Sequence, residues 1–274
     1  MPSLKQQYQE YLFQRIENHK NSLPRDELLL LGDEAAGELH SEESQFVLTE
    51  VLMAETVDRH ISKRLGLPSY KKWRKNFSEV RAAQRAPVHW GISSANPIVH
   101  LLPRLEPEDQ VLAIGGGVQA EVCLLAAYDT TITFIDGDIA SVDQLETRVA
   151  GESLSSRFHS YVASLGTWMP PFETAASLVV IDGGTLAHLS TGGRHSLLQQ
   201  ARDVTGCGGV HVILPGDGGA TPEAYVSHYP DWDREWTPGD NGTGKTRSMG
   251  VILVPPEEQN DIPQQEMPLA SSSG

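Results

Sequence analysis

The stretch Val111-Leu112-Ala113-Ile114-Gly115-Gly116-Gly117-Val118-Gln119-Ala120 joins an apolar run to three consecutive glycines and the start of a helical segment. A second apolar run, residues 131–135, ends on Asp136. This order predicts a buried strand, a glycine turn, a helix and a second strand with a carboxylate at its carboxyl end. Glycines let a ligand approach the backbone at the helix N-terminus, and a carboxylate accepts hydrogen bonds from ribose hydroxyls. The pattern therefore predicts a parallel α/β sheet that binds a nucleoside.

Two interpretations of the glycines fit the local sequence. Gly115, Gly117 and Ala120 satisfy the dinucleotide pattern G-x-G-x-x-G/A, and Asp136 follows at close to the usual spacing of ~20 residues. A glycine-rich turn after the first strand is also the first motif of the class I S-adenosylmethionine (SAM) methyltransferases, in which it meets the methionine end of the cofactor. The elements that follow distinguish the two.

The later elements favour the second interpretation. We expect a helix to about residue 149, a strand over 159–163 and a strand over 177–182 that ends on Asp182. A helix near 197–204, a glycine turn at 206–209, a strand over 210–215 and a final strand over 246–254 follow. This order resembles the class I SAM-dependent methyltransferase family over roughly residues 88 to 255, with five parallel strands and a terminal antiparallel hairpin. A dehydrogenase would need a separate catalytic domain, for which no segment after the sheet is long enough.

The resemblance implies a Rossmann-like class I methyltransferase sheet with an N-terminal helical cap, and SAM as cofactor. Asp182 is expected to face the transferable methyl and to orient the acceptor or act as general base. The alternative is that Asp182 caps a turn at Gly183-Gly184. His188, in the predicted loop after that turn, is a second candidate base. The residues expected to bind SAM are Gly115, Gly116, Gly117, Asp136, Ser164, Leu165 and Asp182.

Two positions depart from the family pattern. Ala113 stands where an acidic residue is usual, and Gln119 stands where a third glycine is usual. Similar departures occur in nicotianamine synthases and related enzymes, which use the aminobutyrate arm of SAM and carry a D-x-D after the second strand, as at residues 136–138. Their G-S-G-P-L-P run is absent here. Transfer or cyclisation of the aminobutyrate arm, or a catalytically silent SAM-binding protein, are therefore the alternatives to methyl transfer.

Composition indicates a globular protein with an acidic C-terminal part. The chain has 274 residues, of which 39% are hydrophobic. Residues 110–274 hold 7 Lys/Arg against 20 Asp/Glu, a balance of −13 within a total of −15. This charge argues against a nucleic-acid partner and suits the sulfonium of SAM or an amine-bearing small molecule. We predict a small-molecule acceptor, as in biosynthesis within specialised metabolism.

The N-terminal residues and the two cysteines are those expected of a cytoplasmic protein. No run approaches eighteen consecutive apolar residues, and residues 1–7 lack the apolar segment of a signal peptide, so no membrane association is expected. Cys123 and Cys207 are the two cysteines, and in an intracellular protein we expect free thiols. Two cysteines also exclude a cysteine-based zinc site.

Three segments divide the chain: a helical cap over 1–87, the SAM-binding sheet domain over 88–255 and a disordered tail over 256–274. Helical spacing of apolar residues predicts a helix from Ser44 to Leu65, and Ser69 is a candidate N-cap for a helix reaching about Ala83. The cap is expected to close over the cofactor, and its alternative role is a dimerisation arm in a homodimer. The residues expected to line the substrate pocket are Tyr70, Trp73, His89 and Trp90, and the alternative for His89 and Trp90 is a structural hinge between cap and sheet. Asn96-Pro97 is expected to open a short helix.

Three further patterns are ambiguous. Residues 239–246 match the P-loop pattern G-x-x-x-x-G-K-[ST], but no buried strand precedes them and no helix follows, so we predict a hairpin loop. Asp182 and Asp217 are compatible with a Mg²⁺ site, although we predict no metal. Eight Lys/Arg against one Glu over residues 63–85 are typical of a solvated helix face, or of a docking site for a carboxylate, a phosphate or a carrier protein.

Overall fold

The computed structural model describes residues 3–41, 50–154, 157–172, 174–216, 221–239 and 247–256. The chain divides into two compact units, Met1–Ala82 and Ala83–Gly274. Within the described ranges, no helix combines the length and the apolar character that spanning a membrane requires. The predicted tail after residue 256, Asp217 and most of the P-loop match lie outside these ranges.

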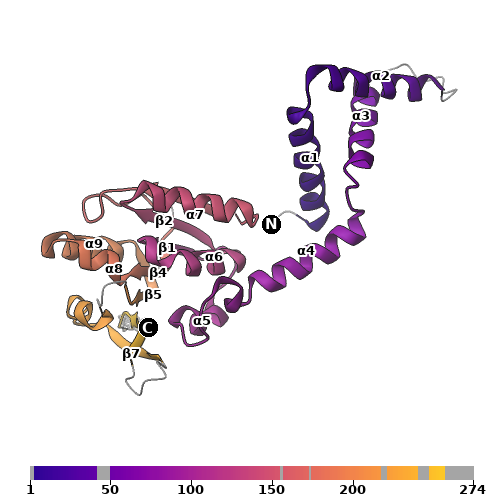
Figure 1. The fold of residues 1–274 in the computed structure, drawn as a ribbon. Coiled ribbons are helices and arrows are strands. Elements are labelled where there is room, and N and C mark those ends of the chain that lie inside the picture. Colours follow the sequence, from indigo (N-terminus) through magenta and orange to yellow (C-terminus); the bar gives the residue numbers. More distant parts are fainter. Residues whose placement is uncertain are drawn as a thin grey trace, which may run out of the picture. The chain divides into compact units, whose positions relative to one another are not determined.

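The helical unit contains α1 (Leu4–Ser22), α2 (Arg25–Ser41), α3 (Glu50–Arg64) and most of α4 (Tyr70–Gln84) (Figure 1). The described parts of the two predicted helices are confirmed by α3 and α4. Its apolar core is small and centres on Ile16, Leu31 and Ile61. Trp73 of α4 packs against Tyr8 of α1, with ring centroids 5.4 Å apart.

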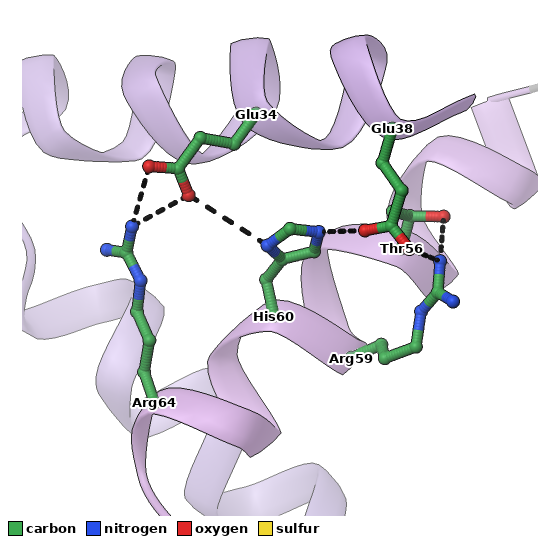
Figure 2. Close-up of polar contacts among 6 residues, drawn as sticks. All are labelled: Glu34, Glu38, Thr56, Arg59, His60 and Arg64. Carbon is green, nitrogen blue, oxygen red and sulfur yellow. Dashed lines mark hydrogen bonds and ion pairs between the residues drawn. The ribbon is translucent and has the colours of Figure 1, made fainter. Parts of the chain in front are cut away.

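A network of charged side chains joins α2 to α3 (Figure 2). Arg64 donates to both carboxylate oxygens of Glu34, at 2.9 and 2.7 Å. His60 lies between two carboxylates, with Nε2 2.5 Å from Glu38 and Nδ1 3.9 Å from Glu34. Arg59 extends the network to Glu38 at 3.1 Å. Charge therefore supplements the small apolar core of this unit.

The sheet unit contains one seven-stranded sheet in the order β3-β2-β1-β4-β5-β7-β6. The first five strands are parallel, and β7 is antiparallel to both of its neighbours. The predicted Rossmann-like α/β sheet with a terminal antiparallel hairpin is thus confirmed. In the dinucleotide-binding order 3-2-1-4-5-6 a parallel strand would occupy the place of β7. The strands are β1 (Gln110–Ile114), β2 (Thr131–Asp136), β3 (Phe158–Val162), β4 (Ala176–Asp182), β5 (Thr205–Leu214), β6 (Asp233–Gly239) and β7 (Arg247–Val254).

Successive residues of a strand point to opposite sides of the sheet, so these apolar strands present apolar side chains on both faces. Helices cover both faces. Val111 and Ala113 of β1 belong to one apolar cluster, while Leu112 and Ile114 belong to the other. The first cluster contains residues of α5 (Pro97–Leu101), α6 (Gln119–Ala127) and α7 (Ile139–Gly151). The second contains residues of α8 (Gly183–His188), α9 (Thr191–Asp203) and the 3₁₀ segment η5 (Pro222–His228). Asn96 caps α5, as predicted.

Three predictions about local structure are wrong. The glycines at 206–209, expected in a turn, lie inside β5, where Gly208 has φ +73° and the pairing with β4 is irregular. Residues 183–188, expected as a turn and loop, form α8, and α9 begins at Thr191 rather than near Leu197. The strand before the predicted hairpin loop, whose bounds were not predicted, is β6 at residues 233–239, paired with β7.

Both cysteines are free, as predicted. Cys123 is buried in α6, and burial raises the pKa of its thiol to about 11. Cys207 is exposed on β5.

Candidate functional site

The glycine turn after β1 lies between two pairs of polar side chains. A Cβ built on Gly116 would be 2.7 Å from the Ser141 hydroxyl and 3.1 Å from Oδ2 of Asp136. A Cβ on Gly117 would be 2.6 Å from the Asp182 carboxyl carbon, and one on Gly115 would overlap Thr185. Gly115 also has φ +91°, a conformation that side chains disfavour. The glycines are therefore required by close approach of the protein's own side chains.

Asp136 presents one carboxylate oxygen to the turn. The residue is 7% exposed at the end of β2. Its Oδ1 accepts a hydrogen bond of 3.1 Å from the Asp138 backbone N–H. Its Oδ2 faces Gly116, and no described residue donates a hydrogen bond to it. This oxygen is free to accept hydrogen bonds from a ligand, as the sequence analysis expects of Asp136.

An open depression of about 440 Å³ lies at the carboxyl ends of β2 and β3. Its position is the edge of an open α/β sheet at which ligands bind. The structure places Ser164 and Leu165, two of the predicted cofactor-binding residues, in its lining. The lining residues are Gly137, Val162, Ala163, Ser164, Leu165 and Leu189.

Asp182 caps α8 with both of its oxygens. Oδ1 accepts from the Gly184 N–H at 2.9 Å, and Oδ2 accepts from the N–H and the hydroxyl of Thr185, at 3.0 and 2.8 Å. The Tyr225 hydroxyl anchors the same helix by donating to the Gly183 carbonyl at 3.0 Å. The alternative given for Asp182 is that it caps a turn at Gly183-Gly184. The structure shows that Asp182 has a capping role, but it caps the helix α8 rather than a turn.

Gln119 and Glu121 project from the first turn of α6. The Gln119 amide donates to the backbone oxygen and the hydroxyl of Ser141, both at 3.1 Å, so this side chain joins α6 to α7. Glu121 is 7% exposed and accepts a hydrogen bond of 2.8 Å from Asn96. Burial raises the pKa of the Glu121 carboxyl and the charge of Asp182 adds to that rise, whereas hydrogen bonds from Asn96 and the backbone oppose it. Ala113 stands where the family pattern has an acidic residue, and Glu121 supplies a carboxyl group near Asp182 instead.

His188 is exposed at the end of α8, directly before Leu189 of the depression. The structure does not show a hydrogen bond between His188 and Asp182 among the described residues.

The structure does not bring His89 and Trp90 to the glycine turn. Trp90 is buried in the apolar cluster beside α6 and α7, and its indole N–H donates to the Gln84 carbonyl at 2.6 Å. Arg148, near the C-terminus of α7, stacks over the Trp90 ring at 5.2 Å. Because α7 starts at the carboxyl ends of the strands and runs back, its C-terminus lies at the opposite edge of the sheet. The expected pocket role of Trp90 is therefore replaced by packing.

Tyr70 and Trp73 belong to the aromatic contacts of the helical unit. Trp73 is 7% exposed and stacks on Phe77 at 4.8 Å, and Tyr70 packs against Tyr8 at 5.4 Å. These ring contacts account for both side chains within the helical unit without a ligand.

Two further sequence motifs concern metal and phosphate binding. Within the described residues, no group of three or more His, Cys, Asp or Glu side chains is arranged to hold a metal ion. The P-loop match begins on the last residue of β6 and ends just before β7, and these strands are antiparallel neighbours. A phosphate-binding P-loop instead joins a strand to a helix.

Comparison with solved structures matches the chain to methyltransferases. A glycopeptide N-methyltransferase, MtfA, is 14% identical with a TM-score of 0.47, and the match covers 62% of this chain and all of that one. The N-methyltransferase NodS from Bradyrhizobium japonicum is 12% identical with a TM-score of 0.45, over 58% of this chain and 93% of that one. An rRNA methylase from Streptococcus thermophilus is 12% identical with a TM-score of 0.45, over 62% and 96%. No protein-family model matches the sequence, and no curated protein is significantly similar to it. At these identities, none of the matched structures assigns a role to a residue of this chain.

Proposed function

We propose that this protein is a SAM-dependent methyltransferase that acts on a small-molecule acceptor. The observation that carries the proposal is the Oδ2 atom of Asp136, which faces Gly116 beside an open depression at the carboxyl edge of the sheet. A buried carboxylate with a free acceptor oxygen in this place suits the two hydroxyls of a ribose. The antiparallel β7 beside β5 favours SAM over a dinucleotide.

The residues around the turn suit both halves of SAM. Ala163, Ser164 and Leu165 offer backbone and apolar contacts next to Asp136, as an adenine ring requires. Asp182 and Glu121 are acidic and near enough to each other to interact electrostatically. Such charges attract the sulfonium and the amino group of SAM.

SAM would supply an electrophilic methyl group on its sulfonium. The contribution of the chain is to hold the acceptor in line with that methyl and to exclude water. Asp182 would orient an acceptor hydroxyl or amine through a lone pair that α8 does not use. His188, at the exposed end of α8, is the residue proposed to accept a proton. The helical unit is proposed to cap the site or to form a homodimer, and the protein is proposed to act in cytoplasmic biosynthesis.

The second candidate is attack on the aminobutyrate arm of SAM. It is favoured by Ala113 and by the Gln119 amide bound to Ser141, because both alter the methionine end of the site. Methyl transfer leaves S-adenosylhomocysteine, whereas attack on the arm leaves methylthioadenosine. We expect S-adenosylhomocysteine when purified protein is incubated with SAM and a cell extract, and chromatography with mass spectrometry separates the two products. Enzyme-dependent methylthioadenosine would establish the second candidate.

Calorimetry on two matched variants tests SAM binding. Asp136→Asn removes the charge that faces the turn, and we expect SAM affinity to fall by about 2 kcal/mol, as for a charge-assisted hydrogen bond. Asp138→Asn is the control, because Asp138 caps α7 through the Ala140 N–H and Asn is an equally good cap. Equal losses in the two variants, or saturable NAD binding that SAM does not displace, would contradict the proposal.

A further inference from the structure

The helix α4 exposes four cationic side chains on one face. Lys71, Lys72, Arg74 and Lys75 line an open depression of about 610 Å³, with Ser69 and Ser78 at its two ends. All six residues are exposed. Residues at positions i, i+3, i+4 and i+7 share one side of a helix, so Lys71, Arg74, Lys75 and Ser78 form a continuous face.

The opposite side of α4 is turned inward. Trp73 packs against Tyr8 and Tyr11 of α1, at 5.4 and 6.2 Å, and stacks on Phe77. These contacts fix the rotation of the helix about its axis. The basic face is therefore held outward by the packing of the aromatic face.

Described carboxylates of the helical unit do not neutralise this face. Among them, Glu79 pairs with Lys75 at 3.8 Å, with both side chains more than 60% exposed. Such a pair is worth little in water. By contrast, Arg64 and Arg85, at either end of the basic segment, bind Glu34 and Asp129 at 2.7 and 2.9 Å. The four central cations thus keep their charge available to a ligand.

The shape of the face favours an extended polyanion over a small one. All lining residues come from one short segment, so no second element closes over a bound molecule. Small-molecule sites are concave and bury most of their ligand. An extended chain of phosphates gains affinity from several exposed contacts at once.

The residue types favour nucleic acid over an acidic protein. Within α4, the exposed large apolar side chain is Val80, which lies outside the lining. Protein interfaces depend on buried aromatic or apolar anchors, whereas phosphate contacts need Lys and Arg alone. The aromatic rings of α4 face inward, so they are not available to stack on bases.

We propose that the basic face of α4, defined by Lys71, Lys72, Arg74 and Lys75, binds the phosphate backbone of RNA without reading its sequence. Ser78 favours RNA over DNA, because its hydroxyl donates to the Arg74 carbonyl at 2.9 Å and keeps lone pairs that a ribose 2′-hydroxyl can use. This partner differs from the expectation drawn from the acidic sheet region. The net charge of −15 opposes binding elsewhere on the molecule and makes the contact sensitive to salt.

Fluorescence anisotropy with a labelled 20-mer of oligouridylate tests the proposal. Four phosphate contacts predict that log Kobs falls with log salt with a slope of about −3. The variant Lys71→Gln/Lys72→Gln/Lys75→Gln should lose at least ~10-fold in affinity and reduce the slope by about 2. The variant Lys5→Gln/Arg15→Gln/Arg25→Gln removes the same charge from exposed residues of the same unit and should leave both quantities nearly unchanged.

Other outcomes would overturn the proposal. Equal loss in both triple variants would mean a diffuse charge effect, and equal binding of oligothymidylate would remove the preference for RNA. Binding of poly-L-glutamate in place of oligouridylate would indicate an acidic protein as the partner. SAM affinity is measured separately on the same variants, so failure of RNA binding and failure of the proposed methyltransferase site are distinguishable.

Discussion

The two units of this protein are stabilised by different interactions. Strands of the sheet unit bury apolar residues on both faces, and β1 alone places four fully or almost fully buried side chains, residues 111–114, between two helical layers. The helical unit instead combines a small core with the partly exposed charge network around His60 (Figure 2). Apolar burial is insensitive to salt, whereas exposed ion pairs are screened by it. The two units should therefore respond differently to mutation, pH and ionic strength.

The largest expected effect is a cavity in the sheet unit. Phe134→Ala removes a fully buried ring of β2 and should lower the free energy of unfolding by about 3–5 kcal/mol. Ile139→Ala is the control, because Ile139 is 71% exposed and its truncation should change stability by less than ~0.5 kcal/mol. Urea denaturation measures both. Similar effects of the two substitutions would mean that burial does not dominate this unit.

The next effect concerns a buried histidine of β5. His211 is fully buried between Thr205 and Tyr229, at 2.7 and 2.9 Å, and burial, with a smaller contribution from Arg202, lowers its pKa from 6.5 to about 3. The unfolded chain binds a proton that the folded chain does not, so stability is complete above pH 6.5 and declines as pH falls toward 3.

The expected decline is about 1.4 kcal/mol per pH unit, or close to ~3 kcal/mol over two units. We expect the stability advantage of the wild type over His211→Gln to shrink by this amount in urea titrations at decreasing pH. Carboxylates titrate in both proteins and cancel in the comparison. Parallel pH profiles would show that His211 is not kept neutral by burial.

A smaller effect tests the glycine turn. The sequence analysis attributes Gly117 to close approach of a ligand, whereas the structure places Asp182 against it. Gly117→Ala should therefore destabilise the sheet unit itself, by about 1–3 kcal/mol, because the new methyl crowds the carboxylate that caps α8. Gly137→Ala is the control, since its Cβ would meet nothing nearer than the Ala163 carbonyl at 3.6 Å. An unchanged melting temperature combined with lost SAM binding would instead show that Gly117 is needed for close approach of a ligand.

The smallest expected effect concerns the ion pair between Arg64 and Glu34 in the helical unit. Arg64 and Glu34 are each about half exposed, so a double-mutant cycle with Arg64→Gln and Glu34→Gln should give a coupling of about 0.2–1 kcal/mol that fades in ~1 M salt. Hydrogen exchange of α3 reports it. The neighbouring His60 hydrogen bond lowers the pKa of the Glu38 carboxyl, so its contribution is lost as pH falls below 4.5. A coupling that persists in salt would contradict this picture.

Apolar runs predicted most of the sheet, because burial on both faces leaves a long unbroken hydrophobic signal. The same logic missed α8, whose first two residues are glycines of low helix propensity held by the Asp182 cap. It also did not yield the bounds of β6, which contains Pro238 and, among the described strands, pairs with β7. Extension of β5 through residues 206–209 depends on an irregular pairing that no sequence pattern records.

The geometry of the candidate site follows from the sequence where one strand end defines it, and does not where separate elements meet. Asp136 follows directly from its strand, and the structure leaves its Oδ2 open toward the turn. Ser141 and Thr185 reach the glycines only through the packing of α7 and α8. Glu121 was detectable, since an acidic residue in the otherwise apolar segment 120–127 signals a buried charge with a partner.

The position of β7 between β5 and β6 also constrains the order in which the last strands can join the sheet. β6 is synthesised before β7 but pairs only with it, so residues 233–239 have no place in the sheet until residues 247–254 have emerged. Until then the β5 edge presents unpaired backbone groups over an apolar segment, which is the kind of edge that neighbouring chains can extend. A released chain truncated before residue 247 would therefore expose this edge to intermolecular strand pairing, which insertion of the last strand prevents.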